Sequence, residues 1–330
     1  MVAYKSSADV PIDRRRLVVG VFNAALLAGA GLVGTGAKAQ FAPNTASHRT
    51  REMPEAMSLD AVRFIDVDGL KLRYLRSEGE GGIPVLLTSP WPESLFAFRH
   101  VWPVLSAEAP LVALDLPGFG HSEGRPALMS PKAMGAFLPK ILAALGVERV
   151  HAVGPDVGTS ALLFAAGGYP KLFESLVVGS GATDASLTTG GLRNIIDAPS
   201  TKAFEGGSGE DFASGSINRM MAGRPDPDVL NDYKAGSTGR RFIDAMAYVR
   251  NYPGDLAELH ARLPSIRTPV LSIWGAHDPI VPASNADALD KKLPRTRSVL
   301  LDSGHFVWED QAEQYAAAVR DWIRGGYRDA

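Results

Sequence analysis

A sharp turn in the sequence carries an acidic residue, Asp156, between an apolar run and an alanine-rich segment. The turn reads Gly154-Pro155-Asp156-Val157-Gly158. It has the outline of the G-x-S-x-G nucleophile elbow, a tight strand-to-helix turn that exposes a serine, with aspartate in place of the serine. A carboxylate here can attack a saturated carbon and form an alkyl ester, which water can then hydrolyse at the enzyme's own carbonyl carbon.

Asp278 and His305 supply the partners that this chemistry needs. Each follows an apolar run later in the chain. Hydrolysis of the ester requires a base that takes a proton from water, a role suited to His305, and an acid that orients the imidazole, a role suited to Asp278. Asp184, which also follows an apolar run, is a second candidate for the acid. The sequence therefore predicts a triad of Asp156, Asp278 and His305.

Two backbone N–H groups are expected to bind the oxyanion that forms during ester hydrolysis. They belong to Val157, directly after the nucleophile, and to Trp91, in the loop Thr88-Ser89-Pro90-Trp91-Pro92-Glu93-Ser94. Neither residue is proline, so both can donate a hydrogen bond.

Short apolar runs alternate with helical patterns, an order that favours a mostly parallel sheet covered on both faces. Polar residues just past the carboxyl ends of such strands converge on one crevice. A hairpin precedes these strands, because residues 61–67 and 70–74 alternate apolar and polar side chains around Asp68-Gly69. The expected strands cover 84–87, 111–114, 150–153, 176–178, 269–273 and 298–301, and the clearest helices cover 134–145, 160–166 and 312–323.

The alternation stops between 183 and 265, where helical segments at 217–221, 228–233 and 241–250 follow one another. A helical insertion between two strands forms a lid over the sheet edge. We therefore expect a core of residues 59–182 and 266–330 and a helical cap of residues 183–265.

The chain resembles the α/β-hydrolase superfamily. The order Asp156, Asp278, His305 matches its nucleophile-acid-histidine order, and Asp115-Leu116-Pro117-Gly118-Phe119-Gly120 lies between the Trp91 loop and the elbow. The sequences Pro155-Asp156-Val157 and Trp91-Pro92-Glu93-Ser94 resemble the epoxide hydrolase and haloalkane dehalogenase branch, which uses aspartate as nucleophile. The resemblance implies an α/β-hydrolase fold with an inserted helical cap. Ser89-Pro90 departs from the His-Gly usual before the aromatic residue.

The leaving group separates the two activities of this branch. Dehalogenases bind the halide through a tryptophan directly after the nucleophile, where this chain has Val157, and all five tryptophans lie outside the expected cap. Epoxide hydrolases use cap tyrosines as the ring-opening acid, and residues 248–251 resemble their Tyr-Arg-Asn stretch, with Val249 directly before the arginine. Tyr248 is the first candidate for this acid, and Tyr252 and Tyr233 follow it. Tyr252, Tyr233 and Trp91 are also the expected substrate contacts.

The composition narrows the class of protein. The chain has 330 residues and a formal net charge of -2, a balance that argues against nucleic-acid binding. It has no cysteine, which excludes a thiolate nucleophile. We expect no cofactor and no metal, since neither a dinucleotide fingerprint nor metal-ligand spacing is present, and we expect a small, mostly apolar substrate.

The N-terminal residues resemble a bacterial twin-arginine export signal. Paired arginines precede Leu17-Val18, a weakly hydrophobic stretch follows, and Ala37-Lys38-Ala39 forms a cleavage motif. We therefore expect a signal peptide at 1–39, a loose segment at 40–58, and a periplasmic or secreted protein without stable membrane insertion.

The sequence favours a hydrolase that opens an epoxide to a diol through an ester on Asp156. Haloalkane dehalogenation, another α/β-hydrolase activity and a non-catalytic ligand-binding role are the alternatives.

Overall fold

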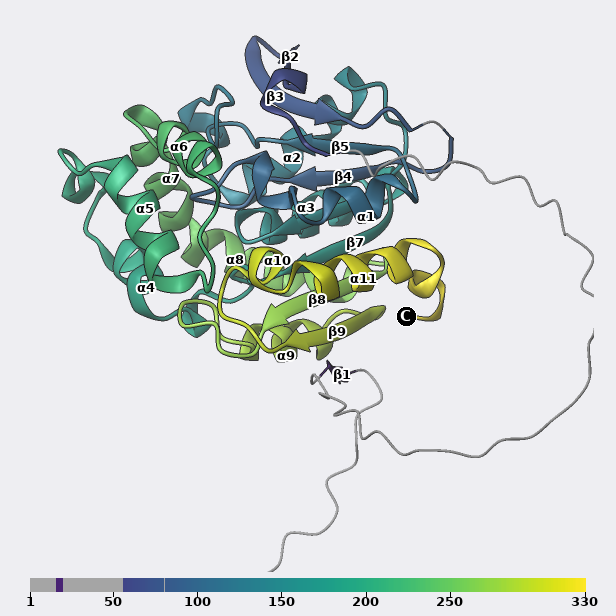
Figure 1. The fold of residues 1–330 in the computed structure, drawn as a ribbon. Helices are drawn as coiled ribbons and strands as arrows, with labels where there is room; N and C mark the ends of the chain where they lie inside the picture. Colours follow the sequence, from purple (N-terminus) through teal and green to yellow (C-terminus); the bar gives the residue numbers. More distant parts are fainter. Residues whose placement is uncertain (1–15, 20–55, 80) are drawn as a thin grey trace, which may run out of the picture.

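A nine-stranded sheet runs through the molecule in the computed structural model, which describes residues 16–19, 56–79 and 81–330 (Figure 1). The strand order is β1-β9-β8-β7-β6-β4-β5-β3-β2. All neighbouring strands are parallel except the β2–β3 and β3–β5 pairs. The strands are β1 Arg16–Val19, β2 Arg63–Val67, β3 Leu70–Arg76, β4 Val85–Thr88, β5 Leu111–Leu114, β6 Val150–Pro155, β7 Phe173–Gly179, β8 Val270–Gly275 and β9 Thr296–Leu301.

Each apolar run that the sequence singled out forms a strand, and the expected hairpin is the β2–β3 pair. Its turn places Asp68 and Gly69 at φ 56° and 79°. Two consecutive positive φ values are typical of a type I′ turn, which matches the twist of the strands it joins.

Alternate side chains of the strands enter two different hydrophobic cores. On β4, for example, Leu86 packs into one core and Val85 and Leu87 pack into the other. Side chains alternate between the two faces of a strand, so a continuous apolar run is what a sheet covered on both faces requires.

Helices cover both faces of this sheet (Figure 1). Helices α2, α3 and α8 contribute to the core on one face, and α1, α10 and α11 to the core on the other. The helices are α1 Trp102–Ser106, α2 Pro131–Ala144, α3 Val157–Gly168, α4 Gly190–Asp197, α5 Gly209–Met220, α6 Pro227–Gly236, α7 Arg240–Arg250, α8 Tyr252–Arg262, α9 Ser284–Asp290, α10 Val307–Asp310 and α11 Ala312–Ile323. Short 3-10 helices are η1 Leu59–Ala61, η2 Leu95–Phe98, η3 Pro126–Leu128, η4 Pro170–Leu172, η5 Ala185–Leu187, η6 Thr201–Phe204, η7 Leu263–Ser265 and η8 Gly326–Asp329.

The segment between β7 and β8 is helical throughout, without a strand in residues 180–269. Helices α4 to α7 gather beyond one end of the sheet (Figure 1). Helix α8 instead packs against α2 and α3 on the flank of the sheet. The last helix of the expected 183–265 cap, α8, therefore packs on the core and leads the chain back to the sheet.

The predicted signal peptide falls mostly on residues 1–15 and 20–39, which lie outside the described residues, as do residues 40–55 of the loose segment. Its residues 16–19 form β1, which pairs in parallel with β9. In the described part of the chain, no helix combines the length and apolar character needed to span a membrane.

Candidate active site

Asp156 occupies the turn between β6 and α3, with φ 52° and ψ -121°. Such a backbone costs a residue other than glycine about 1–3 kcal/mol, and it is found where surrounding packing enforces it. That packing is visible at Gly154 and Gly158, where an added Cβ would lie 2.5 Å from the Thr88 hydroxyl oxygen in each case. Both glycines are therefore needed for the elbow to sit against the end of β4.

Asp156 is 9% exposed, and its carboxylate accepts a backbone hydrogen bond, from the Trp91 N–H to Oδ2 at 2.7 Å. The Val157 N–H is the second backbone group that acts on this carboxylate. Burial raises the pKa of Asp156, while the His305 charge and the two N–H groups oppose that rise. Of the two expected oxyanion donors, Trp91 thus forms a hydrogen bond with the side chain of Asp156.

His305 lies between this carboxylate and Asp278. Its Nδ1 is 2.7 Å from Asp278 Oδ2, and its Nε2 is 3.8 Å from Asp156 Oδ1. Asp278 Oδ1 accepts the N–H groups of Ile280 and Val281, both at 2.9 Å. Burial alone would lower the pKa of His305, but Asp278 and Asp156 outweigh it and raise this pKa. Asp278 therefore orients a histidine whose other nitrogen faces Asp156.

Asp184, the alternative acid, lies elsewhere. Its carboxylate accepts the N–H of Ser186 at 2.8 Å and caps the short helix η5. The spacing Asp184-Ala185-Ser186 is a capping pattern, which the sequence could have shown.

The Ser89-Pro90 departure leaves the Trp91 N–H in place. The Ser89 hydroxyl accepts the N–H of Leu116 at 3.3 Å, which ties the start of the loop to the segment after β5. Pro90 lacks an N–H itself but does not affect the donor on the next residue.

Tyr248 reaches the elbow from α7 and donates its hydroxyl proton to the carbonyl oxygen of Val157 at 2.9 Å. Its ring is fully buried and packs edge-on against Phe119. Burial is the main cause that raises the pKa of Tyr248, so the hydroxyl stays protonated.

Tyr252 lies beside Tyr248, with ring centroids 5.9 Å apart. The two tyrosines belong to different helices, since α7 ends at Arg250 and α8 begins at Tyr252. The break places Pro253 in the first turn of α8, where proline is tolerated. Among the described residues the Tyr252 hydroxyl has no hydrogen-bond partner, and its pKa is raised by burial, by Tyr248 and by Asp156.

Tyr233, the third candidate, is not brought to Asp156. Its hydroxyl donates to Glu309 Oε1 at 3.0 Å and accepts from Arg99 at 3.2 Å, within the core on the other face of the sheet. The prediction that Tyr233 contacts the substrate is therefore corrected, because the buried ion pair of Arg99 and Glu309 binds the Tyr233 hydroxyl.

Aromatic side chains extend from the core to the cap near the nucleophile. The indole ring of Trp91 stacks on Phe212 of α5 at 4.7 Å, and Phe212 contacts Phe242 of α7 at 5.5 Å. Within the described segments, no three histidine, aspartate or glutamate side chains are grouped as a metal site requires. The surroundings suit an uncharged, apolar molecule.

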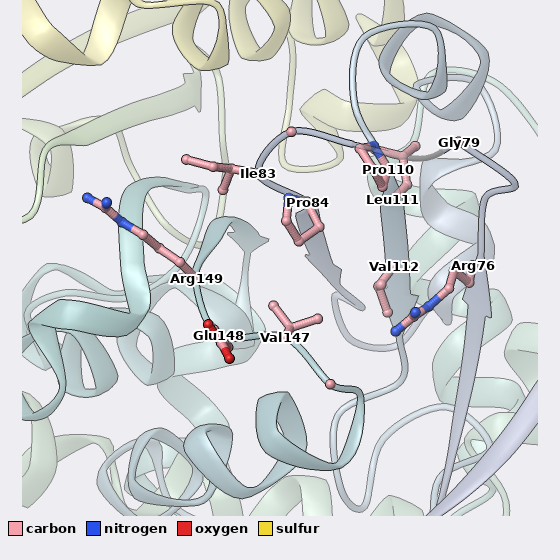
Figure 2. A pocket seen from close by; sticks show the side chains of 12 residues that line it. Arg76, Gly79, Ile83, Pro84, Pro110, Leu111, Val112, Val147, Glu148 and Arg149 are labelled. Carbon is pink, nitrogen blue, oxygen red and sulfur yellow. The ribbon is translucent and has the colours of Figure 1, made fainter.

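A separate hollow of about 440 Å³ lies at the opposite, amino-terminal edge of the sheet (Figure 2). It is bordered by segments that lead into β4, β5 and β6, and its charged lining residues are Arg76, Glu148 and Arg149. None of the predicted site residues borders it.

Comparison with known proteins supports the family. A model of the alpha/beta hydrolase family matches residues 85–318. An uncharacterized hydrolase, YugF, of Bacillus subtilis is 27% identical and covers 81% of this chain and 99% of its own length. Epoxide hydrolase 4 of Mus musculus is 25% identical, with 76% of each chain covered.

The crystal structure of the haloalkane dehalogenase DbeA from Bradyrhizobium elkani shares the fold, with a TM-score of 0.69, 19% identity, and 82% of this chain and 99% of the dehalogenase covered. The expected fold class is confirmed. With its family model spanning the elbow, Asp278 and His305, this chain belongs to the alpha/beta hydrolase family.

Proposed function

We propose that this hydrolase acts through a covalent alkyl ester on Asp156. One observation carries the proposal: Asp156 Oδ2 accepts the Trp91 N–H at 2.7 Å, while Oδ1 lies 3.8 Å from His305 Nε2. One carboxylate oxygen thus sits in the oxyanion hole, and the other faces the base.

We propose an epoxide as substrate. Asp156 Oδ1 attacks a ring carbon, the carbon–oxygen bond of the ring breaks, and the oxygen takes a proton from a tyrosine. Tyr252 is the better donor in the structure, because Tyr248 already donates its proton to the Val157 carbonyl. This reverses the order that the sequence favoured.

Hydrolysis of the ester then uses the triad. Water attacks Cγ of Asp156 as His305 removes its proton, and the oxyanion on Oδ2 is stabilised by the N–H groups of Trp91 and Val157. The intermediate collapses by expelling the alkoxide, which takes the proton from His305. The second proton of the attacking water, left on the Asp156 carboxyl group, returns to the tyrosinate and restores both side chains. The diol leaves with the oxygen that had been Oδ1, and Asp156 keeps one oxygen from water.

A halide as leaving group is the second candidate, since a haloalkane dehalogenase shares the fold. A halide needs N–H donors around it, and only Trp91 offers an indole beside Asp156. Trp102, Trp274, Trp308 and Trp322 are each at most 2% exposed within the core, and the Trp308 indole donates to Glu93. The tyrosines beside Asp156 therefore favour the epoxide.

The test uses the His305→Gln variant, which blocks the second step. The variant is incubated with epoxides and with alkyl halides, and the masses of the intact protein and of its peptides are measured by mass spectrometry. We expect an epoxide adduct on Asp156. An adduct from halides alone overturns the epoxide proposal. No adduct from either class overturns the covalent mechanism and leaves the ligand-binding alternative. The control is His277→Gln, which changes an exposed histidine paired with Asp302; it should turn over without accumulating an adduct.

We also propose export through the twin-arginine signal at residues 1–39. Fractionation of cells that express the full chain, with N-terminal sequencing, should find the mature protein outside the cytoplasm beginning at Gln40. A double Arg15→Lys, Arg16→Lys variant that is exported equally well would contradict this proposal.

A further inference from the structure

The loop that carries the Trp91 N–H is held by the cap at two positions, Pro92 and Ser94. The next three residues along the chain are Pro92, Glu93 and Ser94. The Pro92 carbonyl accepts a hydrogen bond at 3.4 Å from the hydroxyl of Ser237, the residue directly after α6. The Ser94 hydroxyl donates to Asp232 of α6 at 2.6 Å.

Asp232 is the centre of a buried network of charges. Arg73 of β3 donates to both of its carboxylate oxygens, at 2.8 and 3.0 Å, and His121 Nε2 lies 3.1 Å from Oδ1. The side chains of Arg73 and Asp232 are 5% and 8% exposed. A bidentate arginine pair fixes the orientation of a carboxylate, so the oxygen that binds Ser94 has a defined place.

The same network reaches the far end of the loop through Asp115, which follows β5. Arg73 Nη1 also donates to Asp115 at 3.4 Å, and Asp115 Oδ1 accepts the N–H of Leu95 at 2.6 Å. Glu93 is held separately, because its Oε2 accepts the Trp308 indole N–H at 2.9 Å. The loop is thus fixed from the core and from the cap at once.

We propose that Asp232, a cap residue outside the triad, is a positioning residue that holds the Trp91 N–H in the oxyanion hole by binding Ser94. This inference rests on the proposed covalent mechanism and deepens it. The completed oxyanion hole then depends on α6 being docked on the core.

The two chemical steps depend differently on this N–H. During attack by Asp156, Oδ2 loses negative charge as it becomes an ester carbonyl, so the N–H does not favour that transition state. During ester hydrolysis Oδ2 gains a full negative charge, and the N–H stabilises it. A displaced Trp91 N–H should therefore slow the breakdown of the ester selectively.

The Asp232→Asn variant tests this, because the neutral amide leaves Arg73 without its bidentate partner and loosens Ser94. Ser94→Ala is a second variant, which removes the loop's side of the bond and leaves the pair of Arg73 and Asp232 intact. The matched control is Asp228→Asn, which changes an exposed aspartate one turn earlier on α6.

Rapid-quench mass spectrometry with an epoxide gives the rates of ester formation and breakdown. For Asp232→Asn and Ser94→Ala we expect breakdown to fall by about tenfold to 10²-fold, somewhat less than on outright removal of an oxyanion donor, with formation changed less than about twofold. Equal slowing of both steps, or breakdown at the rate of Asp228→Asn, overturns the inference.

A readout that needs no substrate separates this inference from the proposed function. Labelling with ¹⁵N-tryptophan gives five backbone amide signals, and a Trp91→Phe variant assigns that of Trp91. A 2.7 Å bond to a carboxylate places this amide proton downfield. It should move upfield in Asp232→Asn and Ser94→Ala and stay in place in Asp228→Asn. An unmoved signal overturns the positioning role even if no epoxide proves to be a substrate. If the signal moves but the wild type forms no ester, the proposed function alone fails.

Discussion

The two ends of the parallel sheet differ in how far they bury their charged side chains. At the carboxyl-terminal end, Asp156, Asp278 and His305 are 9%, 6% and 1% exposed, and each has a polar partner beneath the cap. At the amino-terminal end, the hollow in Figure 2 is lined by residues such as Arg149, whose side chain is 58% exposed. Burial, and not the presence of a hollow, separates the reactive end from a solvated surface.

The difference has a physical cause. At the carboxyl end, the turn from β6 into α3 places the Asp156 carboxylate against the loop after β4, where the Trp91 N–H donates to it. The three residues are little exposed there, and low solvent exposure strengthens each electrostatic interaction. Solvent and salt screen the arginines at the amino end.

Removal of the nucleophile should have the largest effect. Asp156→Asn keeps the shape of the side chain but removes the negative charge that attacks the epoxide. Steady-state turnover should fall at least about 10⁴-fold, as expected when the central member of a catalytic unit is lost. Product analysis checks this, with circular dichroism to show that the fold is retained; residual turnover within tenfold of the wild type would contradict the role of Asp156.

The acid side of the pH profile follows from the raised pKa of His305. The base must be neutral, so ester breakdown should increase with pH through this pKa and should fall about tenfold per pH unit below it. In the ester Asp156 carries no charge, so burial and the Asp278 carboxylate set the midpoint. Asp278→Asn removes a charge that raises the pKa and should move the midpoint to lower pH. Single-turnover rates of ester breakdown between pH 5 and 9 give the midpoint of each profile. A midpoint that moves to higher pH in Asp278→Asn would contradict the assignment of Asp278 as the partner of His305.

Loss of the ring-opening acid should slow only the first step. Tyr252→Phe should reduce ester formation from an epoxide by about 10²-fold and leave ester breakdown unchanged. Tyr248→Phe should have a smaller effect, because that hydroxyl donates to the Val157 carbonyl. The two formation rates are compared under single-turnover conditions, and the opposite ranking would transfer the role to Tyr248.

The elbow's packing predicts a moderate loss of stability. Gly158→Ala would place a Cβ 2.5 Å from the Thr88 hydroxyl oxygen and should destabilise the fold by about 1–3 kcal/mol. Gly168→Ala, at the other end of α3, meets nothing within 4 Å and should be neutral or stabilising by about 0.4–1 kcal/mol. Urea unfolding at equilibrium measures both, and equal effects would show that the close approach to Thr88 is not limiting.

The smallest effect is expected at the amino end. Arg149→Gln changes a half-exposed residue of the Figure 2 hollow that is paired with Glu174. Because the hollow lies at the opposite end of the sheet from Asp156, turnover should stay within about twofold. Any loss of stability should come from Glu174, whose side chain is 11% exposed and loses its partner. A large change in turnover would show that this end of the sheet takes part in function.

Sequence patterns predicted strands β2 to β9, the hairpin and the helical insertion, because each depends on local periodicity and turn residues. They did not predict β1, which falls within the expected signal peptide. The juxtaposition of Asp156, Asp278 and His305 followed from the rule that polar residues after parallel strands converge.

The orientation of the cap side chains was harder to predict from the sequence. The sequence ranked Tyr248 above Tyr252 and Tyr233. Packing shows that Glu309 binds Tyr233, that the Val157 carbonyl binds Tyr248, and that no described residue binds the Tyr252 hydroxyl. The bond of Asp232 to Ser94 joins residues 138 positions apart, and no local pattern signals it.

A single turnover in H₂¹⁸O tests the central claim most directly. Excess wild-type enzyme is mixed with an epoxide, and the diol and the peptide containing Asp156 are weighed after the first turnover. The covalent mechanism predicts an unlabelled diol and one ¹⁸O in the Asp156 carboxylate. A diol that carries ¹⁸O, with Asp156 unlabelled, would show that water attacks the substrate directly and would contradict the account.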